Sequence, residues 1–599
     1  MLFQSTRGSK TRISVQEAIL KGIADDGGLY VPEYVPKVSP EFIGGLSRMG
    51  YAGAAAAVMG LFMDGFSDGE VAQCAADAYN GHKFDDAGIA PLRALGDGQT
   101  YVLELFHGPT GAFKDMALQF LPGVMSKCLG KTGAKGDTAI LVATSGDTGK
   151  AALEGFRDVP QTRILVFYPE NGVSEIQKLQ MVTQEGGNVS VAAVKGNFDD
   201  AQTGVKAIFS DRAIAQRLGA SGISLSSANS INWGRLMPQI AYYFWAYASL
   251  LGKGAIALGE RVRFAVPTGN FGNILAGWYA KEMGLPISKL ICASNVNNVL
   301  SDFIQTGVYD KNRGFSATMS PSMDILISSN LERLLFELSG KDAELVSGWM
   351  AGLSSRGRYD VGARMRDAVA ETMCGGYATE IETAAAIRSV FGRHGYLMDT
   401  HTAVAMHVYM GMRGNGGGSA AIAGTGKSPE EGARKGENAG AGAASGGGDG
   451  AGKGMASGGG ESAGNGMASG GGDGAGNGMA PGRDSEITVV VSTASPYKFA
   501  KDVYLAINPQ DGADIGGHAG GASGSGGGAS DSSGGGSASG TGGSGSADID
   551  EFRYISLLEA LSNSTAPKSL TELRAKRRRH FTVTAKDGMK DTALSLLLG

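Results

Sequence analysis

Cysteine is scarce in this sequence, and the few cysteines are scattered. The four are Cys74, Cys128, Cys292 and Cys374. None belongs to a C-x-x-C pair, and none has a histidine nearby at the spacing of a metal site. This pattern argues against a disulfide framework and supplies no candidate metal ligands. We therefore expect reduced, mostly buried thiols, no metal site and a cytoplasmic protein.

Long apolar runs and an excess of positive charge are also missing. The longest apolar stretch, Ile240 to Leu251, is shorter than the roughly 18–20 residues that cross a bilayer. The formal net charge of −5 gives no electrostatic case for binding nucleic acid or a membrane. The one basic cluster, Lys576 to Arg579, is flanked by apolar residues, which is typical of a solvated helix end or turn. We expect neither nucleic acid nor a membrane as a partner.

Glycine, in contrast, is in excess, with 97 glycines in 599 residues. The excess lies between Gly411 and Gly545, where a twelve-residue repeat begins at Ser445, Ser457 and Ser469. A solenoid is disfavoured because the repeat has almost no side chains with which to build a core. Flexible surface insertions are expected instead, and they cost little stability because closure entropy grows only logarithmically with loop length.

Outside these tracts, short apolar runs alternate with helical stretches from residue 101 onward. The expected strands are 101–106, 138–143, 163–168, 189–194, 262–266, 290–294 and 486–491. Such alternation predicts βαβ units and largely parallel sheets, with ligands at the carboxyl ends of the strands. A short helix is expected at 13–20, with Ser14 as its N-cap, and residues 40–95 look helical.

Lys114 lies where an extended segment becomes a helix. The turn before it is built from Gly108, Pro109 and Gly111. Apolar neighbours on both sides of Lys114 would bury its stem, and a desolvated lysine has a lowered pKa and a nucleophilic amine. A solvated surface lysine is the alternative, and the apolar neighbours weaken it.

Two glycine-containing loops also connect a strand to a helix. The first, 143–150, combines hydroxyls, exposed amides and a helix N-terminus, which together favour an anion. Asp147 in this loop suits a cofactor hydroxyl or imine better than a phosphate, and a plain N-capping turn is the alternative. The second, 266–273, matches neither G-K-[ST] nor G-x-G-x-x-G, so a single phosphate on a small cofactor fits it better than a dinucleotide. A lysine, an anion loop and a phosphate cradle suggest pyridoxal phosphate.

Colinear blocks along the chain resemble threonine synthase of the shorter microbial and fungal type. The blocks are 5–8, 20–32, 106–115, 145–149, 229–235, 269–273, 322–333, 399–404 and 492–499. They cover the chain apart from the two glycine tracts. The resemblance implies an α/β protein of pyridoxal phosphate fold type II, with two domains whose parallel-rich sheets are flanked by helices. It also implies an N-terminal helical cover domain, which leaves the glycine tracts as disordered insertions.

The expected domains follow the chain in order. They are an N-terminal threonine synthase domain at 1–95, the catalytic region at 96–412, a glycine-rich insertion at 413–484, a return strand and helix at 485–511, a glycine- and serine-rich insertion at 512–547, and a C-terminal segment of the catalytic fold at 548–599.

The resemblance also implies roles for individual residues. The cofactor would be held by Lys114 as a Schiff base, by a phosphate cradle of Gly269, Asn270, Phe271, Gly272 and Asn273, by Thr493 facing the pyridine nitrogen, and by Asp147 near the phenolic oxygen. The substrate would be held by Ser145 and Thr148 at its carboxylate and by Asn232, Arg235 and Lys498 at its phosphate. A phosphate dianion needs fixed cationic donors, and residues three apart on a helix share a face. For Arg235 a structural ion pair is the alternative.

The implied reaction converts O-phospho-L-homoserine and water to L-threonine and phosphate, by β,γ-elimination and hydration. This is the last step of threonine biosynthesis, and Lys114 would act as the general base. We expect a small-molecule substrate and a monomer or homodimer.

Three alternatives stand beside this reading. A threonine-synthase-like phospho-lyase would take the same substrate but release an oxo acid. A serine or threonine dehydratase of the same fold is disfavoured by Asp147, where those enzymes typically place asparagine, and by the cationic phosphate candidates. A catalytically inactive scaffold is disfavoured by the intact Lys114 and cradle.

The chain departs from the family pattern at three positions. Ser495 stands where a histidine is usual, Tyr497 where a small residue is usual, and Thr400 where proline is usual. His401, beside the last of these, is interpreted as structural rather than catalytic. His107 either lies near the chemistry or only orients its turn.

Overall fold

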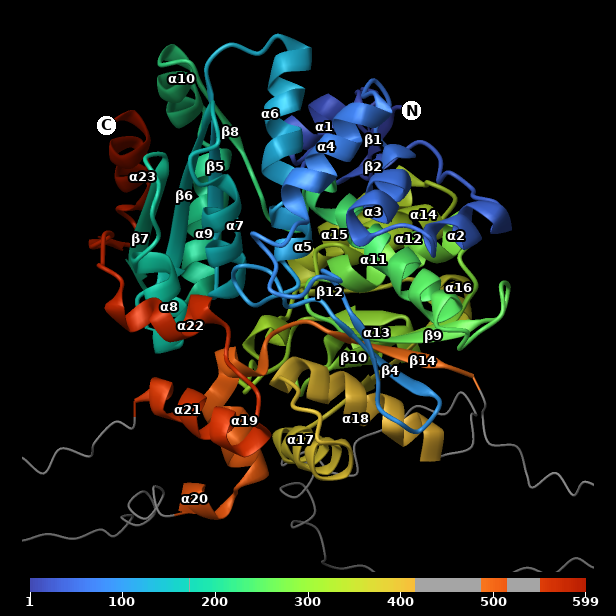
Figure 1. Cartoon of the computed structure of the whole chain (residues 1–599). Coiled ribbons are helices and arrows are strands. Elements are labelled where there is room, and N and C mark those ends of the chain that lie inside the picture. The colour runs from blue at the N-terminus through green and yellow to red at the C-terminus, as the bar shows by residue number, and fades with distance from the viewer. Residues whose placement is uncertain (172, 415–485, 514–549) are drawn as a thin grey trace, which may run out of the picture. The chain divides into compact units, whose positions relative to one another are not determined.

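The computed structural model describes residues 1–171, 173–414, 486–513 and 550–599. The insertions expected at 413–484 and 512–547 lie almost wholly outside these residues. The described residues contain two large sheets, each flanked by helices (Figure 1). The expected α/β class with two parallel-rich sheets is confirmed.

The N-terminal segment pairs two short strands and adds helices beside them. β1 (Phe3–Ser5) and β2 (Tyr30–Pro32) are antiparallel. The helix expected at 13–20 is confirmed as α1 (Val15–Lys21), whose N-cap Ser14 and N3 residue Glu17 satisfy each other's backbone donors in a capping box. The helices that follow are α2 (Pro40–Leu46), α3 (Tyr51–Gly60) and α4 (Asp68–Ala78).

The larger sheet has six strands in the order β13-β10-β9-β14-β4-β3. Its strands are β3 (Leu92–Ala94), β4 (Thr100–Glu104), β9 (Val262–Pro267), β10 (Ile287–Ser294), β13 (Met373–Tyr377) and β14 (Thr488–Ser492). Neighbouring strands run parallel except β3, which is antiparallel to β4. β14 lies between β9 and β4, so a strand from the far side of the first insertion completes the middle of this sheet.

Helices cover the larger sheet on both faces. The helices that pack on or beside it are α11 (Trp233–Gly252), α12 (Gly272–Met283), α13 (Val299–Thr306), α16 (Gly362–Thr372), α17 (Glu380–His394) and α18 (Thr400–Gly414). α11 is buried along most of its length, which explains why its apolar and aromatic run reads as a candidate span in the sequence. No described helix has both the length and the apolar character needed to cross a bilayer.

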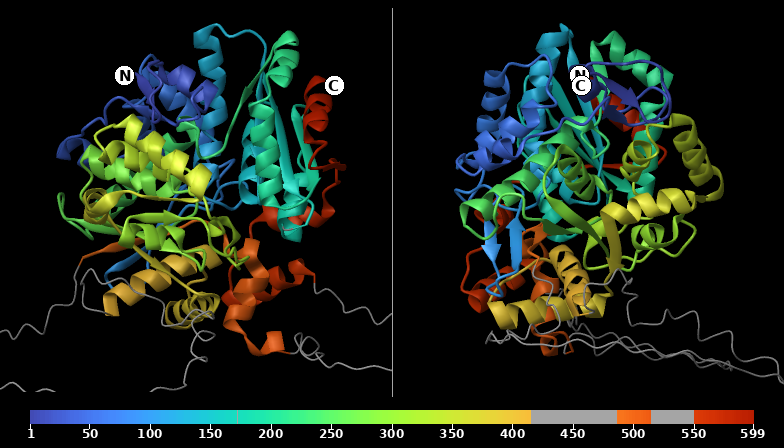
Figure 2. Two further views of the ribbon diagram at one scale, coloured as in Figure 1. Left: turned by 180° about the vertical axis from the view of Figure 1, so that it is seen from behind. Right: turned by 90° about the vertical axis from the view of Figure 1, so that its right-hand side faces the viewer.

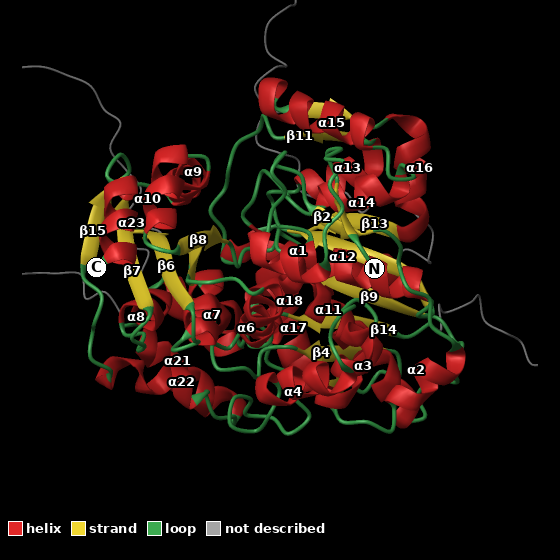
Figure 3. Ribbon diagram, turned by 90° about the horizontal axis from the view of Figure 1, so that it is seen from above, coloured by secondary structure: helices red, strands yellow, loops and turns green. Residues whose placement is uncertain are grey.

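The second sheet has five parallel strands in the order β15-β7-β6-β5-β8. They are β5 (Asp137–Ala143), β6 (Thr162–Pro169), β7 (Val189–Lys195), β8 (Ile223–Ser226) and β15 (Thr582–Ala585). Its helices are α7 (Asp147–Phe156), α8 (Glu175–Val182), α9 (Phe198–Phe209), α10 (Arg212–Ala220) and α23 (Met589–Leu598). α6 (Leu121–Thr132) packs against α7 and against the N-terminal helices α1 and α4. The two sheets stand side by side when seen from above (Figure 3), and α23 lies beside the second sheet (Figure 2).

Shorter elements connect these layers. Between α13 and α16 lie β11 (Val308–Asp310), η1 (Pro321–Met323), α14 (Leu331–Leu338), α15 (Ala343–Arg356) and β12 (Arg358–Asp360). After β14 come η2 (Pro496–Phe499), α19 (Ala500–Ile507), α20 (Gln510–Ala513), α21 (Glu551–Ser562), α22 (Lys568–Thr571) and η3 (Glu572–Ala575). A one-turn helix, α5 (Asp115–Leu118), follows Lys114.

All the strands expected from the sequence are present, as β4, β5, β6, β7, β9, β10 and β14. The helical interpretation of 40–95 is wrong at its end, where residues 92–94 form β3 and pair with β4. β13 was not expected because it contains Gly375 and Gly376, which are poor strand formers. A Cβ at Gly375 would lie 2.9 Å from Ser301 Cα, and one at Gly376 would lie 2.6 Å from Val408 Cγ1. These glycines therefore let α13 and α18 pack closely on the strand.

Candidate active site

One cavity of about 1080 Å³ lies where strands of both sheets end. The loops after β4, β5, β9 and β14 all contribute to its wall, as expected for the carboxyl ends of parallel strands. The predicted site residues on its wall are Lys114, Ser145, Asp147, Thr148, Arg235, Gly269, Asn270, Phe271, Gly272, Asn273 and Thr493. Two predicted residues, Asn232 and Lys498, are not on the wall.

Lys114 occupies the N-cap position of α5, and only 8% of it is exposed. The turn before it is held by the Asp115 carboxylate, which accepts hydrogen bonds from the backbone N–H of Thr110 at 2.9 Å and from its hydroxyl at 2.8 Å. The Lys114 ammonium lies 4.9 Å from the centre of the Phe113 ring. Burial lowers the pKa of Lys114, and the cations of Lys498 and Arg235 act in the same direction. The amine of Lys114 is therefore buried and has a lowered pKa, as expected.

Asp147 is the first residue of α7, and its carboxylate is buried against two lysines. Oδ2 lies 3.1 Å from Lys114 Nζ, and Oδ1 lies 2.6 Å from Lys498 Nζ. Oδ1 also accepts a hydrogen bond from Gln177 Nε2 at 3.0 Å. Burial alone would raise the pKa of Asp147, but the two ammonium groups outweigh it and hold the pKa well below its ordinary value. Asp147 is therefore a fixed anion beside Lys114.

The loop between β9 and α12 forms a cradle at a helix N-terminus. Phe271 has a left-handed backbone with φ of 65°, and a Cβ at Gly269 would lie 2.5 Å from the carbonyl oxygen of Ser322. Asn273 Oδ1 accepts hydrogen bonds from the hydroxyls of Tyr242 and Tyr243, at 2.6 and 2.8 Å. Asn273 Nδ2 is buried and has no partner among the described residues. Free amides, a glycine that admits no side chain and an unpartnered donor fit a phosphate group.

Arg235 presents a cation to the same cavity from the first turn of α11. Its guanidinium donates to the carbonyl of Ala228 at 2.8 Å and to the hydroxyl of Thr148 at 3.4 Å. No carboxylate among the described residues forms an ion pair with it, so the structural ion pair considered above is absent there. Burial lowers the pKa of Arg235 to about 10, which leaves it charged at neutral pH. A buried, unpaired guanidinium on a cavity wall suits an anionic ligand.

Asn232 was predicted to bind the substrate phosphate, but it does not lie on the cavity wall. It is the N-cap of α11 and not part of its helical face. Its Oδ1 accepts from the backbone of Gly234 at 2.8 Å, and its Nδ2 donates to the carbonyls of Ile19 and Ser227 at 2.9 Å each. The side chain is fully buried and holds the start of α11 against α1.

Lys498 was assigned the same role, which stays a prediction, and it does not lie on the cavity wall either. Its side chain is fully buried, and its ammonium contacts Asp147 and not the cavity. Asp147 also pairs with Lys114, so one carboxylate faces two ammonium groups, and Lys498 Nζ has no hydrogen-bond partner among the described residues. It acts on Lys114 through the shared partner Asp147.

Thr493, at the end of β14, lies next to the Lys114 loop. Its carbonyl accepts a hydrogen bond from the backbone N–H of Phe113 at 2.8 Å. Ala494 and Ala112 form an adjacent β-bridge. These contacts join the strand that follows the first insertion to the loop of Lys114, as expected if both belong to one site.

Ser322, on η1, is a site residue that sequence reasoning missed. Its hydroxyl lies 3.4 Å from both Lys114 Nζ and Asp147 Oδ2. The backbone N–H of Ser322 donates to His401 Nε2 at 3.1 Å, and His401 Nδ1 lies 2.9 Å from Asp399 Oδ1. An Nε2 that accepts leaves the proton on Nδ1, so Asp399 sets the tautomer of His401. His401 therefore positions the η1 turn, which agrees with the structural interpretation; only the resemblance block 322–333 had signalled this region.

Thr400 holds the segment just before η1, because its hydroxyl donates to the carbonyl of Met319 at 2.6 Å. A proline there would lack that hydroxyl.

His107 is absent from the cavity wall and instead lies between Asp85 and Glu104, at 2.7 and 3.0 Å. Of its two interpretations, the one in which it orients its turn fits these contacts.

The other sequence features lie away from the cavity. Lys576 to Arg579 is an exposed loop after η3, and Arg579 pairs with Glu185 at 2.8 Å. All four cysteines are free thiols. Among the described residues, no group of three or more His, Cys, Asp or Glu side chains could hold a metal ion.

Comparison with known families agrees with this geometry. Residues 88–423 match the family described as pyridoxal-phosphate dependent enzyme, and residues 2–79 match the threonine synthase N terminus. A crystal structure of threonine synthase from Brucella melitensis with bound pyridoxal phosphate matches with a TM-score of 0.73 and 32% identity, and the match covers 100% of this chain and 99% of that chain. The fold and the site therefore define a pyridoxal-phosphate-dependent enzyme of fold type II.

Curated relatives narrow the family further. Threonine synthase of Pseudomonas aeruginosa is 40% identical over 408 residues, covering 67% of this chain and 83% of that protein. Threonine synthase of Saccharomyces cerevisiae is 36% identical over 429 residues, covering 67% and 82%. Human threonine synthase-like 1 is 42% identical over 399 residues, covering 65% of this chain and 53% of that protein, so the chain spans about half the length of that relative. The chain belongs to the threonine synthase family.

Proposed function

We propose that the protein converts O-phospho-L-homoserine and water to L-threonine and phosphate. The observation that carries the proposal is that one cavity is lined both by the loop Gly269 to Asn273 and by Arg235, which has no carboxylate partner among the described residues. The cradle at Gly269 to Asn273 suits the phosphate of the cofactor, and Arg235 suits a second phosphate on the substrate. Relatives named threonine synthase, of which the matched region covers more than four-fifths, support the same activity.

The residues on the cavity wall divide into those for the cofactor and those for the substrate. The cofactor would be held by Lys114 through a covalent bond, by the cradle through backbone amides and Asn273 Nδ2, by Asp147 near the phenolic oxygen and by Thr493 at the pyridine nitrogen. When bound, pyridoxal phosphate supplies an electron sink that makes the Cα proton of an amino acid removable. At that position Thr493 would offer the cofactor a hydroxyl and not a carboxylate.

Lys114 would accept and donate the protons that are transferred in the reaction. Its amine is buried and has a lowered pKa, so it would be able to accept the Cα proton of a substrate held beside it. The Asp147 anion and the Ser322 hydroxyl hold Nζ in place for this transfer. Arg235 would orient the substrate phosphate for departure from Cγ, and the hydroxyls of Ser145 and Thr148 would bind the substrate carboxylate.

The phospho-lyase remains the nearest alternative. Both activities use the same substrate, so the cradle and Arg235 would serve either one. A dehydratase needs no second phosphate site, so the unpaired Arg235 disfavours it. An inactive scaffold has no use for a buried lysine paired with an anion.

The substitution Lys114→Ala tests the assignment of the cofactor and the base together. The variant should lack the visible absorbance of the cofactor imine and should form no threonine. A variant that keeps both the absorbance band and threonine formation would contradict the proposal. Gly130→Ala is a suitable control for correct folding, because a Cβ there meets nothing within 4 Å.

The remaining expectations concern the location, the oligomeric state and the partners of the protein. The cytoplasmic location, the monomer or homodimer and the lack of nucleic-acid and membrane partners stay predictions. The domain limits given above also stay predictions.

A further inference from the structure

α21, the helix that begins just after residues 514–549, contacts elements on both sides of the site. It packs against α8, which flanks the five-stranded sheet, and against α19, which follows β14 of the six-stranded sheet. Figure 1 shows α21 beneath α8 and beside α19. The two ends of α21 make different contacts. Each end holds a segment that carries a residue bonded to Asp147.

The first residue of α21 caps the N-terminus of α8. The Glu551 carboxylate accepts hydrogen bonds from the backbone N–H groups of Glu175 and Ile176, at 3.3 and 3.2 Å. A carboxylate at this position satisfies two of the orphan donors of a helix and complements its dipole. Gln177, the next residue of α8, points into the site.

Gln177 uses both ends of its amide. Its Oε1 accepts from the backbone N–H of Ser174 at 3.4 Å in the capping box of α8, and its Nε2 donates to Asp147 Oδ1 at 3.0 Å. The position of the α8 N-terminus therefore decides where this donor meets Asp147. Glu551 holds that N-terminus from outside.

The other end of α21 holds the segment of Lys498. The hydroxyl of Tyr497 lies 2.6 Å from Ser564 Oγ and 3.3 Å from Ser562 Oγ, and it donates to the carbonyl of Ser564 at 3.2 Å. Ser562 is the last residue of α21 and donates to the carbonyl of Leu558 at 2.6 Å. Tyr497 is buried and directly precedes Lys498, whose ammonium lies 2.6 Å from Asp147 Oδ1.

Both routes therefore end on the same oxygen atom, Asp147 Oδ1. We propose that α21 is a brace for Asp147 and that Tyr497 and Glu551 are positioning residues, which hold Lys498 and Gln177 on Asp147 Oδ1. Among the lysines that the structure describes, Lys114 alone then contacts Oδ2. This inference rests on the attachment of the cofactor at Lys114 proposed above.

The brace has a consequence for the Lys114 amine. The anion of Asp147 favours the protonated amine, whereas the cations of Lys498 and Arg235 favour the neutral amine. The titratable and charged groups around Lys114 are Asp115 beside it, Asp147 on α7, Arg235 on α11, Asp324 after η1, His401 on α18 and Lys498 on η2. If Lys498 or Gln177 moves off Asp147, more of the Asp147 charge acts on Lys114, and the amine becomes harder to deprotonate.

The test measures how fast cofactor-free protein binds added pyridoxal phosphate at Lys114, by imine absorbance, across a range of pH. Only the neutral amine attacks the aldehyde. Tyr497→Phe and Glu551→Ala should therefore load about three- to tenfold more slowly at neutral pH, the effect of a rise of half to one pKa unit, and should recover at higher pH. The matched controls are Tyr504→Phe, which removes a hydroxyl bonded to Asp511, and Glu70→Ala, which removes a carboxylate that accepts from the backbone of Ser67 at the start of α4.

A brace requires that both controls keep the wild-type pH profile while both test variants shift it. If Tyr497→Phe and Tyr504→Phe give the same profile, or if Tyr497→Phe slows loading equally at every pH, the brace is wrong. Failure of the wild-type protein to load would instead contradict the cofactor site itself, so the two failures are distinct.

Discussion

At the scale of single residues, Asp147 contacts more of the other site residues than any side chain described above. Lys114, Gln177, Ser322 and Lys498 all contact its carboxylate, and they come from four different elements. The sequence could place Asp147 near the cofactor, because it lies in a loop at a helix start. It could not show that Lys498 meets this carboxylate, because that depends on how distant segments of the chain come together.

Arg235 is the residue on which the choice of a phosphorylated substrate depends. Arg235→Gln should lower kcat/KM for O-phospho-L-homoserine about 10- to 100-fold, since a hydrogen bond to a charged group contributes about 1.5–3 kcal/mol. The cofactor absorbance should be unchanged, because the cradle lies on another loop. Steady-state kinetics with the spectrum as a control measures both. An unchanged kcat/KM would remove Arg235 from the substrate site.

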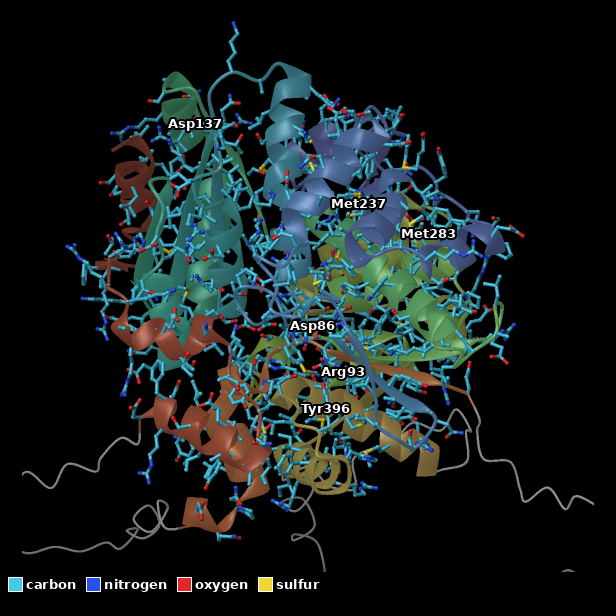
Figure 4. The ribbon with its side chains drawn as sticks, viewed as in Figure 1. Asp86, Arg93, Asp137, Met237, Met283 and Tyr396 are labelled. Atoms are coloured by element: carbon cyan, nitrogen blue, oxygen red, sulfur yellow. The ribbon has the colours of Figure 1, made fainter. Side chains whose placement is uncertain are left out.

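His107 makes stability depend on pH. Burial alone would lower the pKa of His107, but hydrogen bonds to Asp85 and Glu104 raise it from 6.5 to about 9. Glu104 also bonds Arg93 and Tyr396, which lie close together with Asp86 in Figure 4.

A histidine with a raised pKa in the folded state stabilises the protein fully below its unfolded pKa, and the contribution is lost as pH rises through the folded pKa. The stability advantage of the wild type over His107→Gln should therefore be largest below about pH 6.5 and should shrink towards pH 9. Urea unfolding of both proteins across this range measures the difference. An advantage that grows with pH would contradict the charged state assigned to His107.

At the scale of elements, the site is made by loops at the ends of four strands. The sequence predicted these strands, because each is a short apolar run followed by glycine or by a polar loop. It did not predict η1, whose Ser322 approaches Lys114, because no periodicity marks a single turn of this kind. The contacts of η1 with Gly269, Thr400 and His401 exist only in three dimensions.

A substitution in the cradle tests the close approach of η1 to this loop. In Gly269→Ala the new Cβ would lie 2.5 Å from the backbone oxygen of Ser322, so the loop must shift, at a cost of about 1–3 kcal/mol. We expect weaker binding of pyridoxal phosphate, measured by equilibrium titration of the cofactor-free protein. Gly130→Ala, within α6 and free of neighbours, is the matched control and should bind as the wild type does. Equal affinities in the two variants would contradict the close approach of η1 to the cradle.

At the scale of the whole molecule, segments far apart in the chain complete one site. β14, which carries Thr493, follows the first insertion but pairs with β4 and β9 in the middle of the sheet. β15 follows the second insertion and pairs with β7. The return of the chain at 486 was predictable from its strand pattern, whereas β15 is a short run of alternating threonines that gave no clear signal.

The first insertion should be dispensable. Residues 416–481 lie outside the described part of the chain, but α18 before them and β14 after them pack on each other. Deleting Gly416 to Pro481 should leave turnover within about twofold of the wild type, because loop closure depends only weakly on length. A large loss of turnover in a folded, cofactor-loaded deletion variant would mean that the insertion has a catalytic role.

Quantifying every product from one substrate tests the central claim most directly. The cofactor-loaded protein is incubated with O-phospho-L-homoserine, and phosphate, threonine and the oxo acid are measured in the same sample. Threonine synthase activity predicts equimolar phosphate and threonine, and no signal with the Lys114→Ala variant. Phosphate accompanied by the oxo acid in place of threonine, or no phosphate at all, would contradict it.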